Sequence, residues 1–151
     1  MKISDLELIN CVNQSTLEAL TGALLEWDFR AFYLHGESIT NKKTLLAKVE
    51  KDLPMSVGLR PHNWDAFVDC LRGGLSSLAD ERVAIIWIDA HVMLGSDLQD
   101  FLIAIRSLTD VARYVNTGEA GVSHEMRVHV FLVGNSSSFR PFLTESTVAK
   151  E

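Results

Sequence analysis

Two aspartates four residues apart, Asp65 and Asp69, are the residues of this chain whose type and spacing could do chemistry. At 100° per residue, a helix through this stretch stacks them on one face, while Phe67, Cys70 and Leu71 point to the opposite face. Like charges at this spacing destabilise an isolated helix by about 0.2–0.5 kcal/mol. Folding therefore gives no reason to favour the pair, whereas binding of a cationic partner does.

Each aspartate also has a purely structural explanation. Asp65 comes two residues after Asn63, a good helix N-cap, and could serve only to meet the positive end of the helix dipole, an effect of about 0.3–1 kcal/mol. Asp69 lies beyond the first turn, and a surface ion pair with Arg72 would be worth at most about 1 kcal/mol. The dipole explains Asp69 less well, so the binding interpretation is favoured most there. Val68 and Arg72 flank the pair on this face.

The segments around this helix alternate between strand and helix patterns. Residues 31–34, 83–88 and 128–133 are continuously or nearly continuously apolar, as parallel strands covered on both faces are. Apolar residues repeat at helical spacing over 45–53 and 98–115. The alternation predicts an α/β fold with a three-stranded parallel sheet flanked by helices.

The two ends of the chain are predicted to be additions to this unit. The patterns Ser4-x-x-Glu7 and Ser15-x-x-Glu18 are capping boxes followed by apolar residues at helical spacing. We therefore expect residues 1–30 to form a helical extension of two short helices, packed on a domain of residues 31–134. The serine-rich stretch after the third strand predicts a mobile tail over residues 135–151.

Composition and charge narrow the class of partner. The chain has 151 residues, 47% of them hydrophobic, which is enough for one domain to bury a core without disulfides or metals. Its 20 acidic and 14 basic side chains give a net charge of −6, which repels a phosphate backbone. We expect no direct nucleic-acid binding, and a basic protein is the more natural partner.

The chain also lacks the usual marks of export. Its first seven residues include Asp5 and Glu7 where a signal peptide needs an apolar run, and no segment offers the roughly 18 apolar residues of a membrane span. Cys11 and Cys70 form neither a CxxC pair nor a zinc spacing, so two buried free thiols are expected. These features predict a cytoplasmic protein that does not contact a membrane.

In their order along the chain, these motifs resemble the barstar family of intracellular inhibitors of a secreted bacterial ribonuclease. The resemblance covers roughly Ala31 to Gly134 and is carried by Phe32-Tyr33-Leu34-His35-Gly36, Leu53-Pro54, a strand containing Trp87 and, most sharply, the segment Asn63-Trp64-Asp65-Ala66-Phe67-Val68-Asp69-Cys70-Leu71. It implies a bacterial immunity protein or antitoxin without catalysis, which blocks the active site of a basic ribonuclease. We expect no cofactor and no metal.

The resemblance also assigns residues to the contact with the partner. Asp65 and Asp69 would stand in for RNA phosphates and meet the cations of a nuclease site. The family's helix-capping asparagine falls on Asn63, and its following glycine on Gly73. The predicted partner-binding residues are Arg60, His62, Asp65, Val68, Asp69, Arg72 and Gly73.

The sequence departs from the family pattern at several of these positions. The run Leu59-Arg60-Pro61-His62 stands where the family often has a Tyr-Gly pair, and Val68 and Gly74 stand where barstar has exposed tryptophans. The family's acidic contact on the long helix has no clear counterpart, because arginines at i−4 and i+3 bracket Asp110. These departures bear on the identity of the partner more than on the class of inhibitor.

Two other classes of function stay open. Since a fold does not fix a function, the chain could be an acidic protein-interaction module with a non-nuclease partner. A metal-dependent enzyme is the second alternative: His35 follows the first strand, and Asp89 and His91 follow the second, where parallel sheets usually place ligands. The chain has no Gly-rich phosphate loop, nucleophile elbow or His-Glu-x-x-His pattern to support an enzyme.

Overall fold

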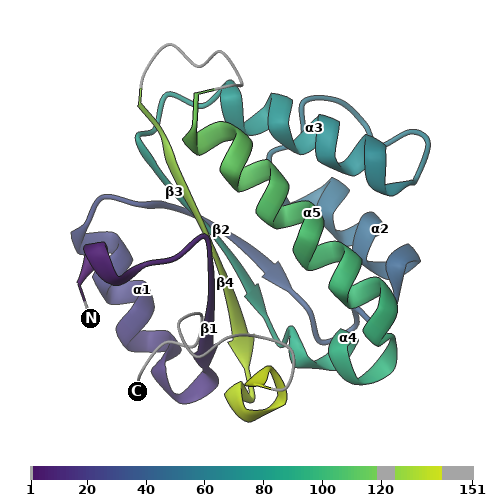
Figure 1. The fold of residues 1–151 in the computed structure, drawn as a ribbon, viewed down its shortest axis with the longest axis horizontal. Helices are drawn as coiled ribbons and strands as arrows, with labels where there is room; N and C mark the ends of the chain where they lie inside the picture. Colours follow the sequence, from purple (N-terminus) through teal and green to yellow (C-terminus); the bar gives the residue numbers. More distant parts are fainter. Residues whose placement is uncertain (1, 119–124, 141–151) are drawn as a thin grey trace.

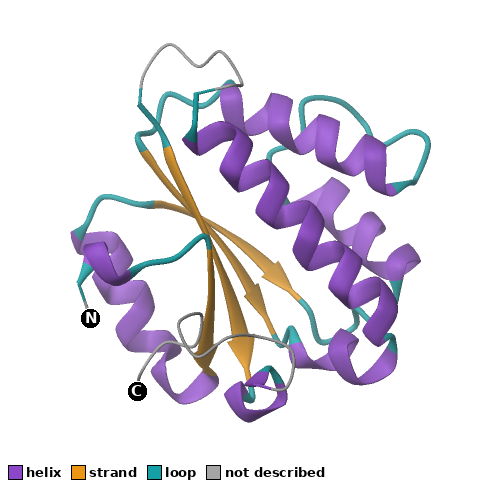
Figure 2. Cartoon of the chain, viewed as in Figure 1, coloured by secondary structure: helices purple, strands orange, loops and turns teal. Residues whose placement is uncertain are grey.

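The computed structural model describes residues 2–118 and 125–140 and shows a parallel sheet between two helical layers (Figure 1). The four strands lie in the order β1-β4-β3-β2, with bounds β1 Ile9–Asn13, β2 Arg30–His35, β3 Arg82–Ile88 and β4 Arg127–Gly134. One face of the sheet carries α1 (Leu17–Glu26). The other carries α2 (Lys42–Asp52), α3 (Trp64–Ser76) and α5 (Leu98–Asn116) (Figure 2). The remaining elements are α4 (His91–Ser96) and 3-10 turns at Ile3–Asp5, Gln14–Thr16 and Ser136–Ser138.

The three predicted strands are confirmed as β2, β3 and β4, all parallel, but the sheet has a fourth strand that was not predicted. β1 pairs with β4, with Ile9 opposite Val130. The prediction of two opening helices is therefore correct for α1 and wrong for residues 9–13. A short strand buried on both faces shows no alternation, so hydrophobic period alone does not separate it from a helix. Asn10, buried in this strand, donates from its side-chain amide to the Val130 carbonyl at 3.2 Å.

Two hydrophobic cores lie on the two faces of the sheet. The larger core lies beneath α2, α3 and α5 and contains Trp87, whose ring centroid is 5.5 Å from that of Phe101. The smaller core lies beneath α1 and includes Leu20 and Phe131. β3 and β4 contribute to both cores, which explains their continuously apolar sequences.

Both cysteines and Phe139, near the start of the predicted tail, are buried. Cys11 and Cys70 are free and buried, as predicted, and burial raises the pKa of the Cys11 thiol to about 12. The predicted mobile tail is wrong at its start, because Phe139 is buried with its ring centroid 6.4 Å from that of Phe101. The rest of that tail, residues 141–151, lies outside the described residues. Within the described residues, every helix is too short or too polar to cross a membrane.

The loop between α2 and α3 folds back across α3 at two glycines. The Ser56 backbone N–H donates to the Cys70 carbonyl at 3.0 Å, and the Pro54 carbonyl lies directly against Gly74. A Cβ atom at Gly74 would overlap this carbonyl, and one at Gly73 would come within 2.9 Å of the Ser56 side chain. The loop backbone therefore fixes the second half of α3 from one side.

Gly74→Ala tests this contact. We expect it to lower the free energy of unfolding by about 1–3 kcal/mol or more, because the loop backbone must move away from the helix. Gly22→Ala is the matched control: Gly22 lies in α1, exposed, with open space where a Cβ would point. It should be neutral or stabilising by up to about 1 kcal/mol. Urea denaturation measures the free energy of unfolding of both variants. Equal changes in the two would contradict the close contact between the loop backbone and Gly74.

Candidate partner-binding face

α3 presents the predicted acidic face to solvent. Asp65 and Asp69 are exposed, and the Asp69 side chain keeps 78% of its accessible surface. On the opposite side, Phe67 and Leu71 are buried in the larger core. The side chain of Asn63 accepts a hydrogen bond from the Ala66 backbone N–H at 2.8 Å, so the helix begins at the predicted cap.

Arg72 is held by an aromatic ring on the neighbouring helix. Its guanidinium carbon lies 4.2 Å from the ring centroid of Tyr114 on α5. Its Nη1 lies 4.0 Å from the nearer Asp69 carboxylate oxygen, which is beyond hydrogen-bond distance. Its Nε is buried and has no hydrogen-bond partner among the described residues. The ring therefore sets the position of Arg72, and the Asp69 carboxylate stays open to solvent.

Glu50 of α2 organises the loop that precedes α3. Its Oε2 accepts a hydrogen bond from the Leu59 backbone N–H at 3.0 Å and lies 3.1 Å from Nε2 of His62. The Leu59 side chain is fully buried, whereas Arg60 and His62 are exposed. One carboxylate thus fixes both ends of the short segment that carries two of the predicted partner-binding residues. Sequence reasoning missed Glu50, because no local spacing connects it to a loop nine residues away.

Val68 and Gly73 lie at the margins of the acidic face. Val68 is partly buried and packs against the larger core. Gly73 is also partly buried, and its closeness to Ser56 already accounts for a glycine there. Contact of either residue with a partner stays a prediction.

On α5, Asp110 lies one helical turn before Tyr114 and is therefore on the same side of that helix. Nη1 of Arg113 lies 3.8 Å from the Asp110 carboxylate, and both side chains are about half exposed or more. Asp110 is therefore paired locally with Arg113, one of the two arginines that bracket it in the sequence.

The alternative metal site at the strand ends does not form. Among residues 2–118 and 125–140, no group of three or more His, Cys, Asp or Glu side chains is placed to hold a metal ion. His35 is exposed and stacks on Tyr33 with ring centroids 6.4 Å apart, whereas Nδ1 of His91 is buried against Gly134. His35, Asp89 and His91 therefore do not make the ligand set that the sequence suggested.

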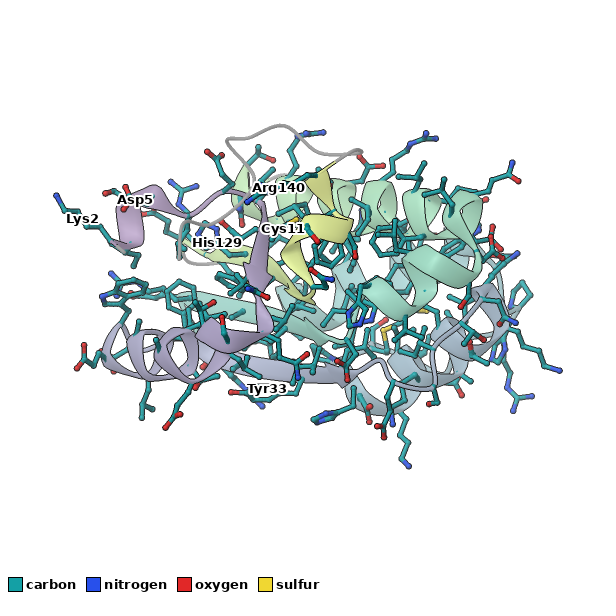
Figure 3. All side chains as sticks on the ribbon, turned by 90° about the horizontal axis from the view of Figure 1, so that it is seen from below. Lys2, Asp5, Cys11, Tyr33, His129 and Arg140 are labelled. Atoms are coloured by element: carbon teal, nitrogen blue, oxygen red, sulfur yellow. The ribbon has the colours of Figure 1, made fainter. Side chains whose placement is uncertain are left out.

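A cavity of about 630 Å³ lies at the opposite end of the sheet, between the N-terminal segment and the starts of β3 and β4. Some of its lining residues make local contacts: Arg127 pairs with Glu125 at 3.2 Å, and Nδ1 of His129, which is labelled in Figure 3, lies 2.6 Å from the Glu7 carbonyl oxygen. Burial lowers the pKa of His129. The contact between His129 and Glu7 fastens the N-terminal segment to β4.

Comparison with known families decides the class of the chain. Residues 29–131 match the family model described as Barstar (barnase inhibitor), which is more than half of the sequence. This chain belongs to the barstar family. Comparison with curated proteins and with solved structures gave no match.

Family membership confirms the resemblance seen in the sequence. Barstar proteins are inhibitors and not catalysts, and the matched span contains α3 with its acidic face. β1 and α1 precede this span, so the barstar match starts at the residue before β2. In this protein the barstar-like unit therefore carries an added parallel strand on the β4 edge of its sheet.

The role of Glu50 in holding the loop gives a second prediction. Glu50→Ala should speed hydrogen exchange at the Leu59 amide and destabilise the fold by about 1 kcal/mol, because that amide loses its acceptor. Glu50→Gln keeps an acceptor oxygen and should retain most of the protection. Glu26→Ala on α1 removes the same charge from an exposed site and serves as the control. Unchanged Leu59 exchange in Glu50→Ala would contradict the proposed role.

Proposed function

We propose that this protein inhibits a basic ribonuclease of the barnase type by placing the acidic face of α3 over the active site. The barstar match supports the class of inhibitor. The observation that carries the mechanism is the exposed pair Asp65 and Asp69 on a helix whose cap and packing fix its orientation.

Electrostatics supports this mode of binding. A ribonuclease site must attract the phosphates of RNA, and two carboxylates on one helix face present comparable negative charge to its cations. The net charge of −6 attracts a basic enzyme over roughly a Debye length, about 8 Å at physiological salt. Complementary charge of this kind speeds association and selects the partner.

The same inhibition suggests a biological role. A cell that makes or receives a ribonuclease needs protection for its own RNA. We infer that this protein acts in the cytoplasm as an immunity protein or antitoxin, with its target encoded nearby or delivered by related cells.

An acidic interaction module with a non-nuclease partner is the second candidate. The observation that favours it is the presence of two arginines, Arg60 in the loop before α3 and Arg72 three residues after Asp69 on α3, since a nuclease surface lined only by cations would repel both. The two candidates differ in what they bind, so one assay separates them.

An inhibition assay tests the proposed function. The full chain is titrated against a panel of basic ribonucleases that includes barnase and the barnase-type enzymes encoded in the source genome, with cleavage of a fluorogenic RNA as the readout. We expect stoichiometric, substrate-competitive inhibition of at least one of them and no effect on an unrelated DNase. Full activity of every ribonuclease at excess inhibitor would favour the second candidate.

The aspartates should contribute to binding without stabilising the free protein. We expect Asp69→Ala to weaken the complex by about 2–5 kcal/mol, the range for truncating one side of a buried charge pair, that of barnase and barstar included. Unfolding of the free variant should change by no more than about 0.5 kcal/mol. Asp65→Ala should weaken binding similarly and also destabilise the start of α3 by up to about 1 kcal/mol.

Calorimetry of binding and thermal melts of the free proteins measure these effects. Glu26→Ala supplies the control, because it makes the same change in net charge on α1, away from the acidic face. If Asp69→Ala bound as tightly as Glu26→Ala, this face of α3 would be excluded from the mechanism.

A further inference from the structure

We propose that Arg72, supported by Tyr114, is a specificity-determining contact that binds a carboxylate of the ribonuclease. The partner surface that fits this face would then hold an acidic group beside its phosphate-binding cations. This inference rests on the proposed function. The acidic pair alone predicts only cations on the partner, whereas Arg72 predicts an acidic group beside them.

The position of Arg72 places it within the acidic face. Asp65, Asp69 and Arg72 follow the spacing i, i+4 and i+7, which aligns them along one side of α3. The Arg72 side chain is 33% exposed, so part of it is accessible to a partner although its Nε atom is buried. A partner that covers both carboxylates must therefore also meet the guanidinium.

Packing alone does not explain an arginine at this position. Its buried Nε–H has no partner among the described residues, and an unpaired buried donor destabilises the free protein. The cation–π contact with Tyr114 offsets part of that cost. A methionine or leucine would cover the same ring without burying a donor, so the charge itself needs a separate reason.

Ion pairing with Asp69 is too weak to supply that reason. Nη1 of Arg72 lies 4.0 Å from the Asp69 carboxylate without a hydrogen bond, and the Asp69 side chain remains 78% exposed, so the pair is worth at most about 1 kcal/mol. Tyr114 instead holds the guanidinium in one place before a partner arrives. An arginine fixed in this way loses less conformational freedom when it binds.

The charge of Arg72 selects between two kinds of nuclease surface. Against a site lined only by cations, Arg72 would repel the partner and weaken the complex. RNA cleavage by general acid–base catalysis needs a base, and a glutamate or aspartate is one of the usual choices. Arginine binds a carboxylate through two parallel hydrogen bonds, so a site with such an acid would gain from Arg72.

The sign of the effect of removing the charge tests the proposal. Affinity is measured by calorimetry against whichever ribonuclease of the panel, barnase included, the wild-type protein inhibits best. We expect Arg72→Gln to weaken binding about tenfold or more, and Arg72→Lys to weaken it as well, since lysine lacks the planar fork. Tyr114→Leu should weaken binding, and Tyr114→Phe, which keeps the ring, should restore it.

Arg106→Gln is the matched control, because Arg106 is exposed on α5 two turns before Tyr114. It should leave binding unchanged or slightly tighter, as expected from the more negative net charge. If Arg72→Gln binds as tightly as Arg106→Gln or more tightly, Arg72 faces cations and the proposal is overturned while the proposed function stands. If the wild-type protein inhibits no ribonuclease of the panel, both the proposed function and the role of Arg72 are contradicted. If the melting temperature of Arg72→Gln falls well below that of the wild-type protein, Arg72→Met, which still covers Tyr114, is measured in its place. We expect Arg72→Met to lose affinity to the same extent.

Discussion

The constraint on which the acidic face depends is the confinement of α3 from two sides. Phe67 and Leu71 anchor one side of the helix in the larger core, and the Pro54–Ser56 backbone crosses it at Gly74. With both sides occupied, the positions at i and i+4 that carry Asp65 and Asp69 face solvent. The acidic pair is therefore displayed by packing on the rest of the helix and not by any interaction of its own.

The sheet supplies the rigid surface for this packing. β3 and β4 are interior strands with helices or turns over both faces, so their side chains are fixed by dense contacts. β1 extends the sheet beyond the span that matches the barstar family and pairs with the β4 edge. The added strand pairs the β4 edge and makes the five-residue β1 the edge strand on that side; a short edge strand offers few unpaired backbone groups to other chains.

Local signals in the sequence were enough to predict much of this arrangement. The Asn63 cap and the apolar period of the following residues predicted α3, its start and the orientation of Asp65 and Asp69. Continuous apolar runs predicted β2, β3 and β4, because strands buried on both faces have that composition.

The features that were missed depend on contacts between distant residues. β1 gives no alternation and follows a pattern that resembles a capping box, so its pairing with β4, about 120 residues later, decides its structure. Glu50 and Tyr114 are ordinary residues of amphipathic helices until the fold brings them to Leu59 and Arg72. No spacing in the sequence connects such pairs, and only the packed structure reveals them.

The central claim is that α3 and the loop before it form the surface that covers the nuclease. Cross-saturation NMR measures this most directly: the bound ribonuclease is irradiated, and the loss of amide signal is recorded along the labelled inhibitor. The account predicts losses centred on Asp65 to Arg72 and on residues 59–62, with α1 unaffected. Losses centred on α1 or on the cavity beside His129, with α3 unchanged, would contradict it.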